Sequence, residues 1–243
     1  MKQGKLITIE AGDGSGKATQ TKLLCDRLQA EGHRVRRIAF PVYDSDSSAL
    51  VRMYLAGDFG AHADDVSAYA ASTFFAVDRY ASYHTAWKAD YEAGAIILAD
   101  RYTTSNMVHQ AVKIEDAKER DSFLDWLWDF EFAKLGLPVP DRVIFLDMAP
   151  DVADRLIEAR AKKEHMAKDI HEKDRDYLRR CHAAYCMLAE KYGWQRIACS
   201  EGGAPRARAA IHADVYAAVQ AVLDSHATGG RVHQQKRTKE GTL

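Results

Sequence analysis

A glycine-rich segment directly behind a short β-branched run is the feature of this sequence that most restricts its fold. The run KLITIE covers residues 5–10, and AGDGSGKATQ follows it at 11–20. A glycine-rich turn between a strand and a helix presents backbone N–H groups to phosphate oxygens, and a lysine there adds a full positive charge. The pattern predicts a strand, a phosphate-binding loop and a helix, which is the α/β arrangement.

The loop departs from the common pattern G-x-x-x-x-G-K-[ST] at both ends, where Ala11 and Ala18 stand. Ala11 replaces only the first glycine. Ala18 removes the hydroxyl that ligates Mg²⁺ in many such loops, although Thr19 follows it. The anion cradle is therefore expected to be intact, while Ala18 offers no side-chain oxygen to a metal ion. The residues expected to bind ATP are Gly12, Asp13, Gly14, Ser15, Gly16, Lys17, Ala18 and Thr19.

Four further short apolar runs, at residues 34–40, 95–100, 142–148 and 194–198, alternate with longer amphipathic stretches. Strands separated by helices indicate a parallel sheet that is covered on both faces. We therefore predict a three-layer P-loop NTPase fold with a five-stranded parallel sheet. A first helix is predicted from the loop to about Ala30, with Leu23, Leu24 and Leu28 on its inner face. One or two helices are predicted within residues 64–93. A further helix is predicted over residues 122–135.

The charge balance and the apolar runs limit the possible partners. Thirty-four Lys and Arg oppose 35 Asp and Glu, so a broad basic surface for nucleic acid or an anionic membrane is not expected. The N-terminal apolar run is too short for a signal peptide, and no later run could span a bilayer. These features predict a soluble cytoplasmic protein.

The cysteines show no C-x-x-C spacing. Without that spacing, reduced and mostly buried thiols are expected rather than a zinc site. The four positions are Cys25, Cys181, Cys186 and Cys199.

Five segments in order give the chain a family resemblance. They are EAGDGSGKAT at 10–19, FPVYDS at 40–45, FFAVDR at 74–79, DRYTTSNMVHQ at 100–110 and DIHE at 169–172. Together they resemble the thymidylate kinases, whose loop reads E-G-x-D-G-x-G-K-x-T and is matched here at every fixed place except Ala11. The agreement extends over about residues 5–225. It implies ATP-dependent phosphorylation of dTMP to dTDP with Mg²⁺, by a protein that is commonly a homodimer.

Two alternatives stay open. The chain could act on another deoxynucleoside monophosphate, because the phosphate machinery is shared. It could also be a non-catalytic nucleotide-binding relative, an alternative that Ala11 and Ala18 motivate.

Cations and a metal ion are the expected catalytic groups, because the acceptor phosphate is already largely dianionic near neutral pH and needs no general base. Lys17 is expected to bridge the β- and γ-phosphates of ATP. Arg101, just past a predicted strand, is expected to clamp the acceptor phosphate with two N–H donors. Asp100 beside it could order Mg²⁺. The resemblance adds Asp13, Ser105 and Glu172 as metal contributors, and Asp13 as a catalytic and substrate contact.

Recognition of the base is expected from two residues one helical turn apart. Phe75 would stack on thymine, and Arg79 would hydrogen-bond its O4 edge. His109 is a further predicted substrate contact, and it stands near the sugar 2′ carbon where relatives often have a tyrosine. The other predicted substrate contacts are Phe40, Pro41, Tyr43, Asn106 and Gln110.

A basic stretch at residues 155–172 corresponds to the segment where the family has a closing lid. Since the loop has Ser15 where some relatives have arginine, Arg160 is expected to supply the main lid cation, with Lys162, Lys163 and Lys168 as helpers. The resemblance thus implies a single P-loop kinase domain over residues 1–228 with a short basic lid at about 158–170. Residues 229–243 are expected to be a flexible tail.

Overall fold

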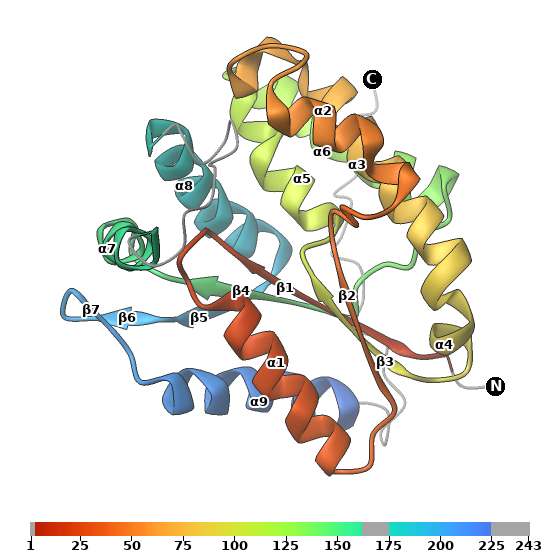
Figure 1. Cartoon of the computed structure of the whole chain (residues 1–243), viewed down its shortest axis with the longest axis vertical. Coiled ribbons are helices and arrows are strands. Elements are labelled where there is room, and N and C mark those ends of the chain that lie inside the picture. Colours follow the sequence, from red (N-terminus) through yellow and green to blue (C-terminus); the bar gives the residue numbers. More distant parts are fainter. Residues whose placement is uncertain (1–2, 162–174, 225–243) are drawn as a thin grey trace, which may run out of the picture.

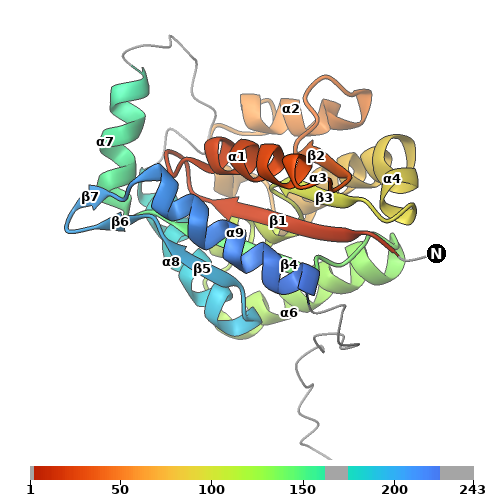
Figure 2. The same ribbon diagram turned by 90° about the horizontal axis from the view of Figure 1, so that it is seen from below.

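A five-stranded parallel sheet forms the centre of the computed structural model, which describes residues 3–161 and 175–224. Its strands in chain order are β1 (Lys5–Ala11), β2 (Val35–Ala39), β3 (Ile96–Asp100), β4 (Arg142–Asp147) and β5 (Gln195–Ala198). They lie in the spatial order β2-β3-β1-β4-β5, and every neighbouring pair is parallel. Helices cover both faces (Figures 1 and 2), so the predicted three-layer α/β fold is confirmed.

Helices and short turns connect the strands. The α-helices are α1 (Lys17–Ala30), α2 (Ala49–Ala56), α3 (Ala68–Ser82), α4 (Lys88–Glu92), α5 (Thr103–His109), α6 (Ala117–Trp128), α7 (Pro150–Ala161), α8 (Arg175–Tyr192) and α9 (Arg208–Asp224). Single 3₁₀ turns lie at Asp46–Ser48, Ala63–Asp65 and Ala111–Lys113. The π-helical segments Tyr83–Trp87 and Asp129–Lys134 extend α3 and α6, and a hairpin of β6 (Ser200–Glu201) and β7 (Ala204–Pro205) precedes α9.

The two faces of β1 pack against different helices. Ile7 and Ile9 belong to the same buried cluster as Leu24 of α1 and Val215 of α9, and α1 and α9 lie beside each other on that face of the sheet (Figure 2). Successive residues of a strand point to opposite faces. Glu10 therefore faces the other helical layer, which contains α5 and α8.

The first helix differs from its prediction at one position. Leu24 and Leu28 are fully buried as expected, but Leu23 is 37% exposed, so its predicted place on the inner face is wrong. Residues 24 and 28 are four apart and share a face of the helix, whereas each single residue step turns by about 100°. One leucine of the three therefore points away from the sheet.

Helix starts follow from capping side chains. Ser67 accepts a hydrogen bond from the backbone of Ala70 and begins α3, so the helical prediction within 64–93 is confirmed. The helix predicted over 122–135 begins earlier, at Ala117, because the carboxylate of Asp116 accepts from the backbone N–H of Glu119 at 2.8 Å. Such a cap satisfies a helix N–H that would otherwise lack a partner.

The sheet places the ends of β1 and β3 side by side. Ile9 pairs in register with Asp100, and the backbone N–H of Arg101 donates to the carbonyl of Ile9 at 3.2 Å. Ligands of open parallel sheets bind beyond these carboxyl ends. The loop after β1 and the residues after β3 therefore share one site.

Candidate active site

The loop after β1 is built as its sequence predicts. Ala11 is the fully buried last residue of β1, so the first departure from the usual loop pattern belongs to the core. Gly14 and Gly16 take left-handed backbone angles (φ 76° and 80°), and Lys17 begins α1. Glycine adopts these angles without steric cost. The turn thus leads directly into a helix N-terminus, which favours anions.

The side chains around this turn differ in their exposure. The hydroxyl of the buried Ser15 donates to the carbonyl of Gly12, which stabilises the turn. Ala18 and Thr19 are both exposed on the first turn of α1. The second departure, at Ala18, therefore leaves the shape of the loop unaffected and removes only a side-chain oxygen.

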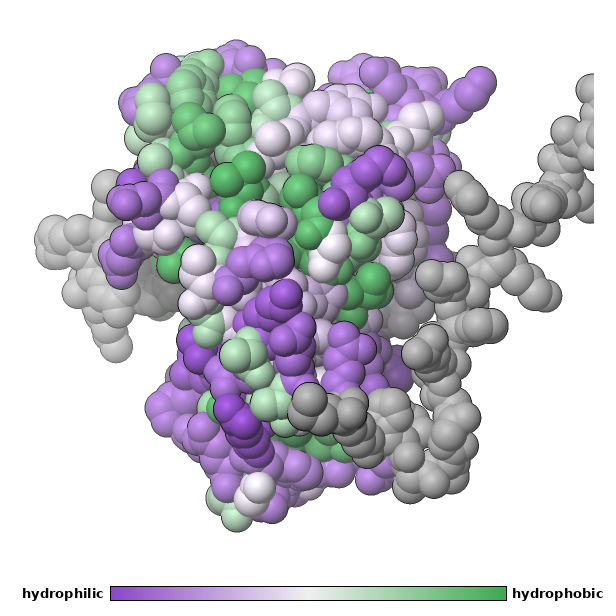
Figure 3. All heavy atoms as spheres, turned by 90° about the vertical axis from the view of Figure 1, so that its right-hand side faces the viewer, coloured by the Kyte–Doolittle hydropathy of each residue, from purple (hydrophilic) through white to green (hydrophobic). Residues whose placement is uncertain are grey.

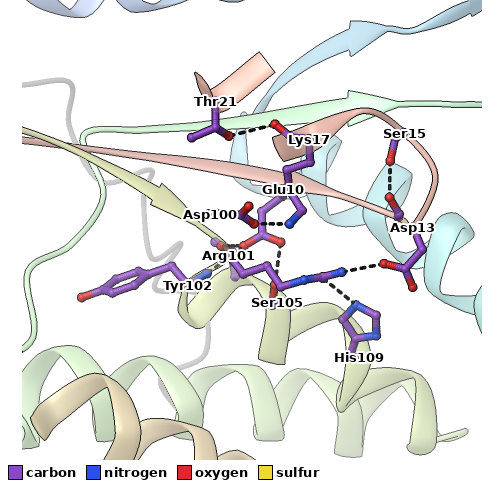
Figure 4. Close-up of polar contacts among 12 residues, drawn as sticks. Glu10, Asp13, Ser15, Lys17, Thr21, Asp100, Arg101, Tyr102, Ser105 and His109 are labelled. Atoms are coloured by element: carbon purple, nitrogen blue, oxygen red, sulfur yellow. Dashed lines mark hydrogen bonds and ion pairs between the residues drawn. The ribbon is translucent and has the colours of Figure 1, made fainter. Parts of the chain in front are cut away.

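Lys17 lies between an acid and another cation. Its ammonium contacts the carboxylate of Asp100 at the end of β3 (Figure 4). Burial and the nearby charge of Arg101 lower the pKa of Lys17, while Asp100 and Glu10 act in the opposite direction. Two cations held this close repel each other unless anions lie between them. The arrangement is suited to a polyanionic ligand.

Arg101 is held by side chains from three elements, and Figure 4 shows its contacts with Asp13 and His109. It has φ 66°, which non-glycine residues seldom adopt. Its Nη2 donates to Asp13 in the loop at 3.0 Å, and its Nη1 lies 3.3 Å from His109 Nε2 on α5 and 3.5 Å from the Tyr185 hydroxyl on α8. Burial works against its charge, but Tyr185 and Asp13 raise the pKa of Arg101 above its ordinary value. The guanidinium is thus charged and fixed in direction.

Glu10 organises this part of the site, and the sequence reasoning missed it. Its fully buried carboxylate accepts hydrogen bonds from the Tyr102 backbone, the hydroxyls of Thr104 and Ser105, and the Tyr185 hydroxyl. A buried carboxylate requires such donors. An acid at the end of an otherwise apolar strand was the signal that could have identified it.

A cavity adjoins the loop. It is partly open to solvent and is bounded by Gly12, Asp13 and Ser15 on one side and by α7 and α8 on the other. Arg175 and Arg179, near the start of α8, line it. The sequence reasoning missed these two arginines because their spacing resembles an ordinary solvated helix face.

The donors predicted for a metal ion are all oxygens. The carboxylates of Asp13 and Asp100 are partly exposed, and each contacts a cation of the site. The Ser105 hydroxyl instead donates to Glu10 at 2.7 Å, and Glu172 lies outside the described residues. Oxygen donors fit Mg²⁺, which prefers hard ligands. Of the four predicted donors, Asp13 and Asp100 are therefore the two whose carboxylates face the cations of the site within the described residues.

The segment after β2 packs beside β3. Phe40 is buried against Tyr102, with ring centroids 5.9 Å apart, and a cis peptide joins it to Pro41. Tyr43 is 53% exposed. Asp78, which the sequence reasoning did not single out, accepts from the backbone of Val42 at 2.8 Å and from Ser47. This carboxylate ties the segment to α3.

Phe75 and Arg79 differ in accessibility, although both lie on α3. Phe75 and its neighbour Phe74 are partly buried, and the Phe75 ring meets Tyr54 edge-on. Arg79 is only 2% exposed, and its Nε and Nη2 donate to Glu131 at 2.7 and 2.5 Å. The structure thus gives two donors of Arg79 a protein partner, which the sequence did not reveal.

The two amide side chains predicted to contact the base are buried. Asn106 donates to the Ser72 carbonyl at 3.2 Å. Gln110, the residue that follows α5, is fully buried, and neither its oxygen nor its nitrogen has a hydrogen-bond partner among the described residues. An unsatisfied buried amide is costly. Gln110 is thus suited to a polar ligand group or a bound water.

The predicted lid cations are mostly outside the described residues. Arg160 lies in the last turn of α7, but its side chain is not described. Lys162, Lys163 and Lys168 fall in the segment that the structure does not describe. Arg155, at the base of the same stretch, donates to the Gly203 carbonyl at 2.5 Å.

Gly14 should resist substitution more than Gly12. A Cβ on Gly14 would lie 2.9 Å from the Ala153 carbonyl and the Ile157 side chain, in addition to the cost of its φ of 76°. Gly14→Ala is expected to destabilise the fold by about 1–3 kcal/mol. Gly12→Ala is the matched control, because its Cβ would meet nothing within 4 Å. Urea unfolding of both variants checks the difference, and equal midpoints would contradict it.

Comparisons with known proteins agree with this geometry. A sequence model described as thymidylate kinase matches residues 9–203. A thymidylate kinase of Mycobacterium tuberculosis is 33% identical over 191 residues, which cover 78% of this chain and 87% of that protein. A probable thymidylate kinase of Pyrococcus horikoshii is 28% identical over 219 residues, which cover 90% of this chain and 97% of that protein. The solved structure of a thymidylate kinase from Candida albicans shares the fold, with a TM-score of 0.64 at 19% identity and 93% coverage of both chains.

Proposed function

Because the chain belongs to the thymidylate kinase family, we propose that it transfers the terminal phosphoryl group of ATP to dTMP and forms dTDP. The observation that carries the proposal is the meeting of Lys17 and Arg101 at the ends of two adjacent strands. Each contacts a carboxylate of the same site, Asp100 and Asp13 respectively. A phosphate loop and a fixed guanidinium thus face each other as donor and acceptor sites require.

The cations position the two phosphates. The loop N–H groups and Lys17 bind the β- and γ-phosphates of ATP, while Arg101 binds the acceptor phosphate with its paired N–H groups. Arg175 and Arg179 add positive charge from α8 across the same cavity. The acceptor oxygen needs no general base, since the second pKa of a phosphate monoester is about 6. Rate enhancement then comes from alignment and charge stabilisation.

Mg²⁺ supplies further charge neutralisation when bound with ATP. Asp100 and Asp13 would hold it through oxygen atoms or bound waters, and by the family resemblance Glu172 would assist. Both aspartates contact cations in the structure. Binding of phosphates to Lys17 and Arg101 would leave these carboxylates available for the metal ion.

Selection of thymine rests on the pocket beside α3 and α5. Phe75 stacks on the base, Arg79 reads its O4 edge, and Asn106 and Gln110 supply further polar contacts. Phe40, Pro41 and Tyr43 bound the acceptor, and His109 lies beside Arg101 near the sugar. The buried Gln110 amide without a partner among the described residues supports a polar ligand group at this place.

A panel of acceptors tests the assignment. Steady-state rates with ATP, Mg²⁺ and each of dTMP, dUMP, dCMP and dGMP should be highest for dTMP. A cytosine would place a donor where Arg79 already donates, so dCMP should be a poor substrate. A dTMP rate no better than those of the other three would favour a kinase for another deoxynucleoside monophosphate.

The chain is proposed to act as a homodimer. Tyr69, Val77 and Tyr80 on α3 are between 39% and 46% exposed and lie along one side of the helix. In Figure 3 hydrophobic side chains gather in the upper half of the face, where α2, α3 and α6 lie in Figure 1. Such an apolar surface suits a second copy of the chain. Light scattering should give the dimer mass and the Val77→Glu variant the monomer mass; a monomeric wild type would refute this.

The proposed location of the protein is the cytoplasm, and its proposed organisation is a single domain. Among the described residues, no helix has the length and apolar character that crossing a membrane requires. We place the protein in the cytoplasm, where its nucleotide substrates occur. The division into one kinase domain over residues 1–228, with a basic lid at about 158–170 and a tail at 229–243, is retained as a proposal. Much of the lid and the whole tail lie outside the described residues.

A further inference from the structure

Three side chains with metal-binding atoms meet apart from the Lys17 and Arg101 contacts, and one of them, His182, lines the cavity. Asp147 ends β4, and His182 and Cys186 lie on α8. One carboxylate oxygen, one imidazole nitrogen and the sulfur all lie within 4.8 Å of one another. In residues 3–161 and 175–224, this is the one group of three or more such side chains that comes so close.

Local geometry brings these atoms together. His182 and Cys186 are four residues apart, so they share a face of α8. That face is turned toward the end of β4, where His182 Nε2 lies 2.7 Å from Asp147 Oδ1. The Asp147 and His182 side chains are 12% and 28% exposed. Solvent can therefore reach the group, while its helix and strand fix the backbone positions.

We propose that Asp147, His182 and Cys186 form a binding site for a transition-metal ion of the Zn²⁺ type. One oxygen, one nitrogen and one sulfur donor suit such a borderline-soft ion, and a solvent molecule would complete a tetrahedron. Mg²⁺ prefers oxygen ligands alone, so this site differs in chemistry from the Asp13 and Asp100 pair. On binding, the Cys186 thiol releases its proton to solvent. His182 binds as the neutral imidazole, and its proton then resides on the ring nitrogen that does not face the metal ion.

Arg196 is the residue that most opposes this site. Its Nε donates to Asp147 Oδ2 at 2.8 Å, and its Nη2 lies 2.7 Å from the same oxygen in an ion pair. The other carboxylate oxygen, Oδ1, faces His182. A metal ion can thus take Oδ1 without displacing the arginine. The guanidinium charge still repels a dication. Removal of that charge should therefore strengthen metal binding, whereas a purely structural ion network would bind no metal in either form.

The site borders the cavity beside the phosphate loop. His182 lines that cavity together with Gly12 and Asp13 of the loop. Metal binding would fix the imidazole at the cavity wall. The binding test below does not depend on kinase activity, so its failure would leave the proposed function untouched.

Cobalt is the probe for the test. Metal-free full-length protein is titrated with Co²⁺, and a thiolate-to-cobalt charge-transfer band is expected to saturate at about one equivalent and to disappear on addition of Zn²⁺. Cys186→Ser should abolish the band. Cys25→Ser is the matched control, because Cys25 is a buried thiol of α1 outside this group. The Co²⁺ band of this variant should equal that of the wild type. His182→Gln should weaken Co²⁺ binding at least tenfold, and Asp147→Asn is a second ligand variant.

Arg196→Gln should bind Co²⁺ several-fold more tightly than the wild type, in contrast to the ligand variants. Thermal unfolding of each variant without metal checks that it folds, and bound metal should raise the melting temperature of the wild type but not of Cys186→Ser. The proposal is overturned if the wild type shows no charge-transfer band with Co²⁺, or if the band persists in Cys186→Ser. It is also overturned if Arg196→Gln binds Co²⁺ more weakly than the wild type does. Displacement of Co²⁺ by equimolar Mg²⁺ would contradict the chemical class of the site.

Discussion

Replacement of Arg101 by alanine should lower kcat by a factor on the order of a hundred or more. The variant should nevertheless still fold and unfold cooperatively on heating. The guanidinium faces the loop from the end of β3 and is fixed by Asp13, His109 and Tyr185. Removal of such a preorganised charge typically costs two to three orders of magnitude in rate. Steady-state kinetics with ATP and dTMP measure the loss.

Two further variants distinguish a catalytic from a structural role for Arg101. Arg101→Lys keeps the charge without the paired donors and should remain well below wild type. Arg34→Ala removes a guanidinium whose side chain is 63% exposed and paired with Asp90, so it should leave kcat unchanged. A near-normal kcat of Arg101→Ala would mean that the acceptor site has been misplaced.

Glu131→Ala should lower the free energy of unfolding more than Gly14→Ala or Glu115→Ala does. Glu131 is fully buried, and it accepts from Arg79 at 2.5 and 2.7 Å and from the Thr103 hydroxyl at 2.7 Å. Glu131→Ala leaves a buried guanidinium without its partner, which costs about 3–5 kcal/mol. The free energy of unfolding in urea is the measurement.

Two controls distinguish the cost of leaving a buried charge unpaired from the cost of removing any carboxylate side chain. Glu115→Ala removes an exposed carboxylate and should change stability by less than about 0.5 kcal/mol. The double variant Arg79→Met with Glu131→Leu should be more stable than Glu131→Ala, because neither charge is then left alone. A Glu131→Ala protein within about 1 kcal/mol of wild type would show that Arg79 finds another partner. The same variants, tested with dTMP, would show whether this ion pair orients Arg79 toward the base.

Local patterns predicted most of the fold. The strand, glycine turn and helix at residues 5–30 depend on nearby residues, and the structure has them where expected. The start of α6 was shifted because a cap such as Asp116 acts through a single hydrogen bond, which the pattern of apolar residues does not show. Leu23 was misplaced because three leucines within six residues fit more than one face of a helix.

Contacts between distant segments could not be predicted in the same way. Glu10 and Tyr185 are 175 residues apart, and Arg79 and Glu131 are 52 apart, so no spacing rule connects them. Cysteine spacing alone likewise argued against a zinc site, whereas the proposed metal ligands combine one cysteine with a histidine and an aspartate from another element. The loop and Arg101 were recognisable because short motifs surround them.

A coupled assay of ADP release tests the central claim most directly. Purified protein with ATP and Mg²⁺ should form ADP only slowly, and addition of dTMP should start rapid ADP formation that stops when the metal is chelated. Lys17→Met should remove the activity, because the loop then lacks its charge for the β- and γ-phosphates. ATP binding without dTMP-dependent ADP formation, in the presence of Mg²⁺, would contradict the assignment and identify a non-catalytic nucleotide-binding relative.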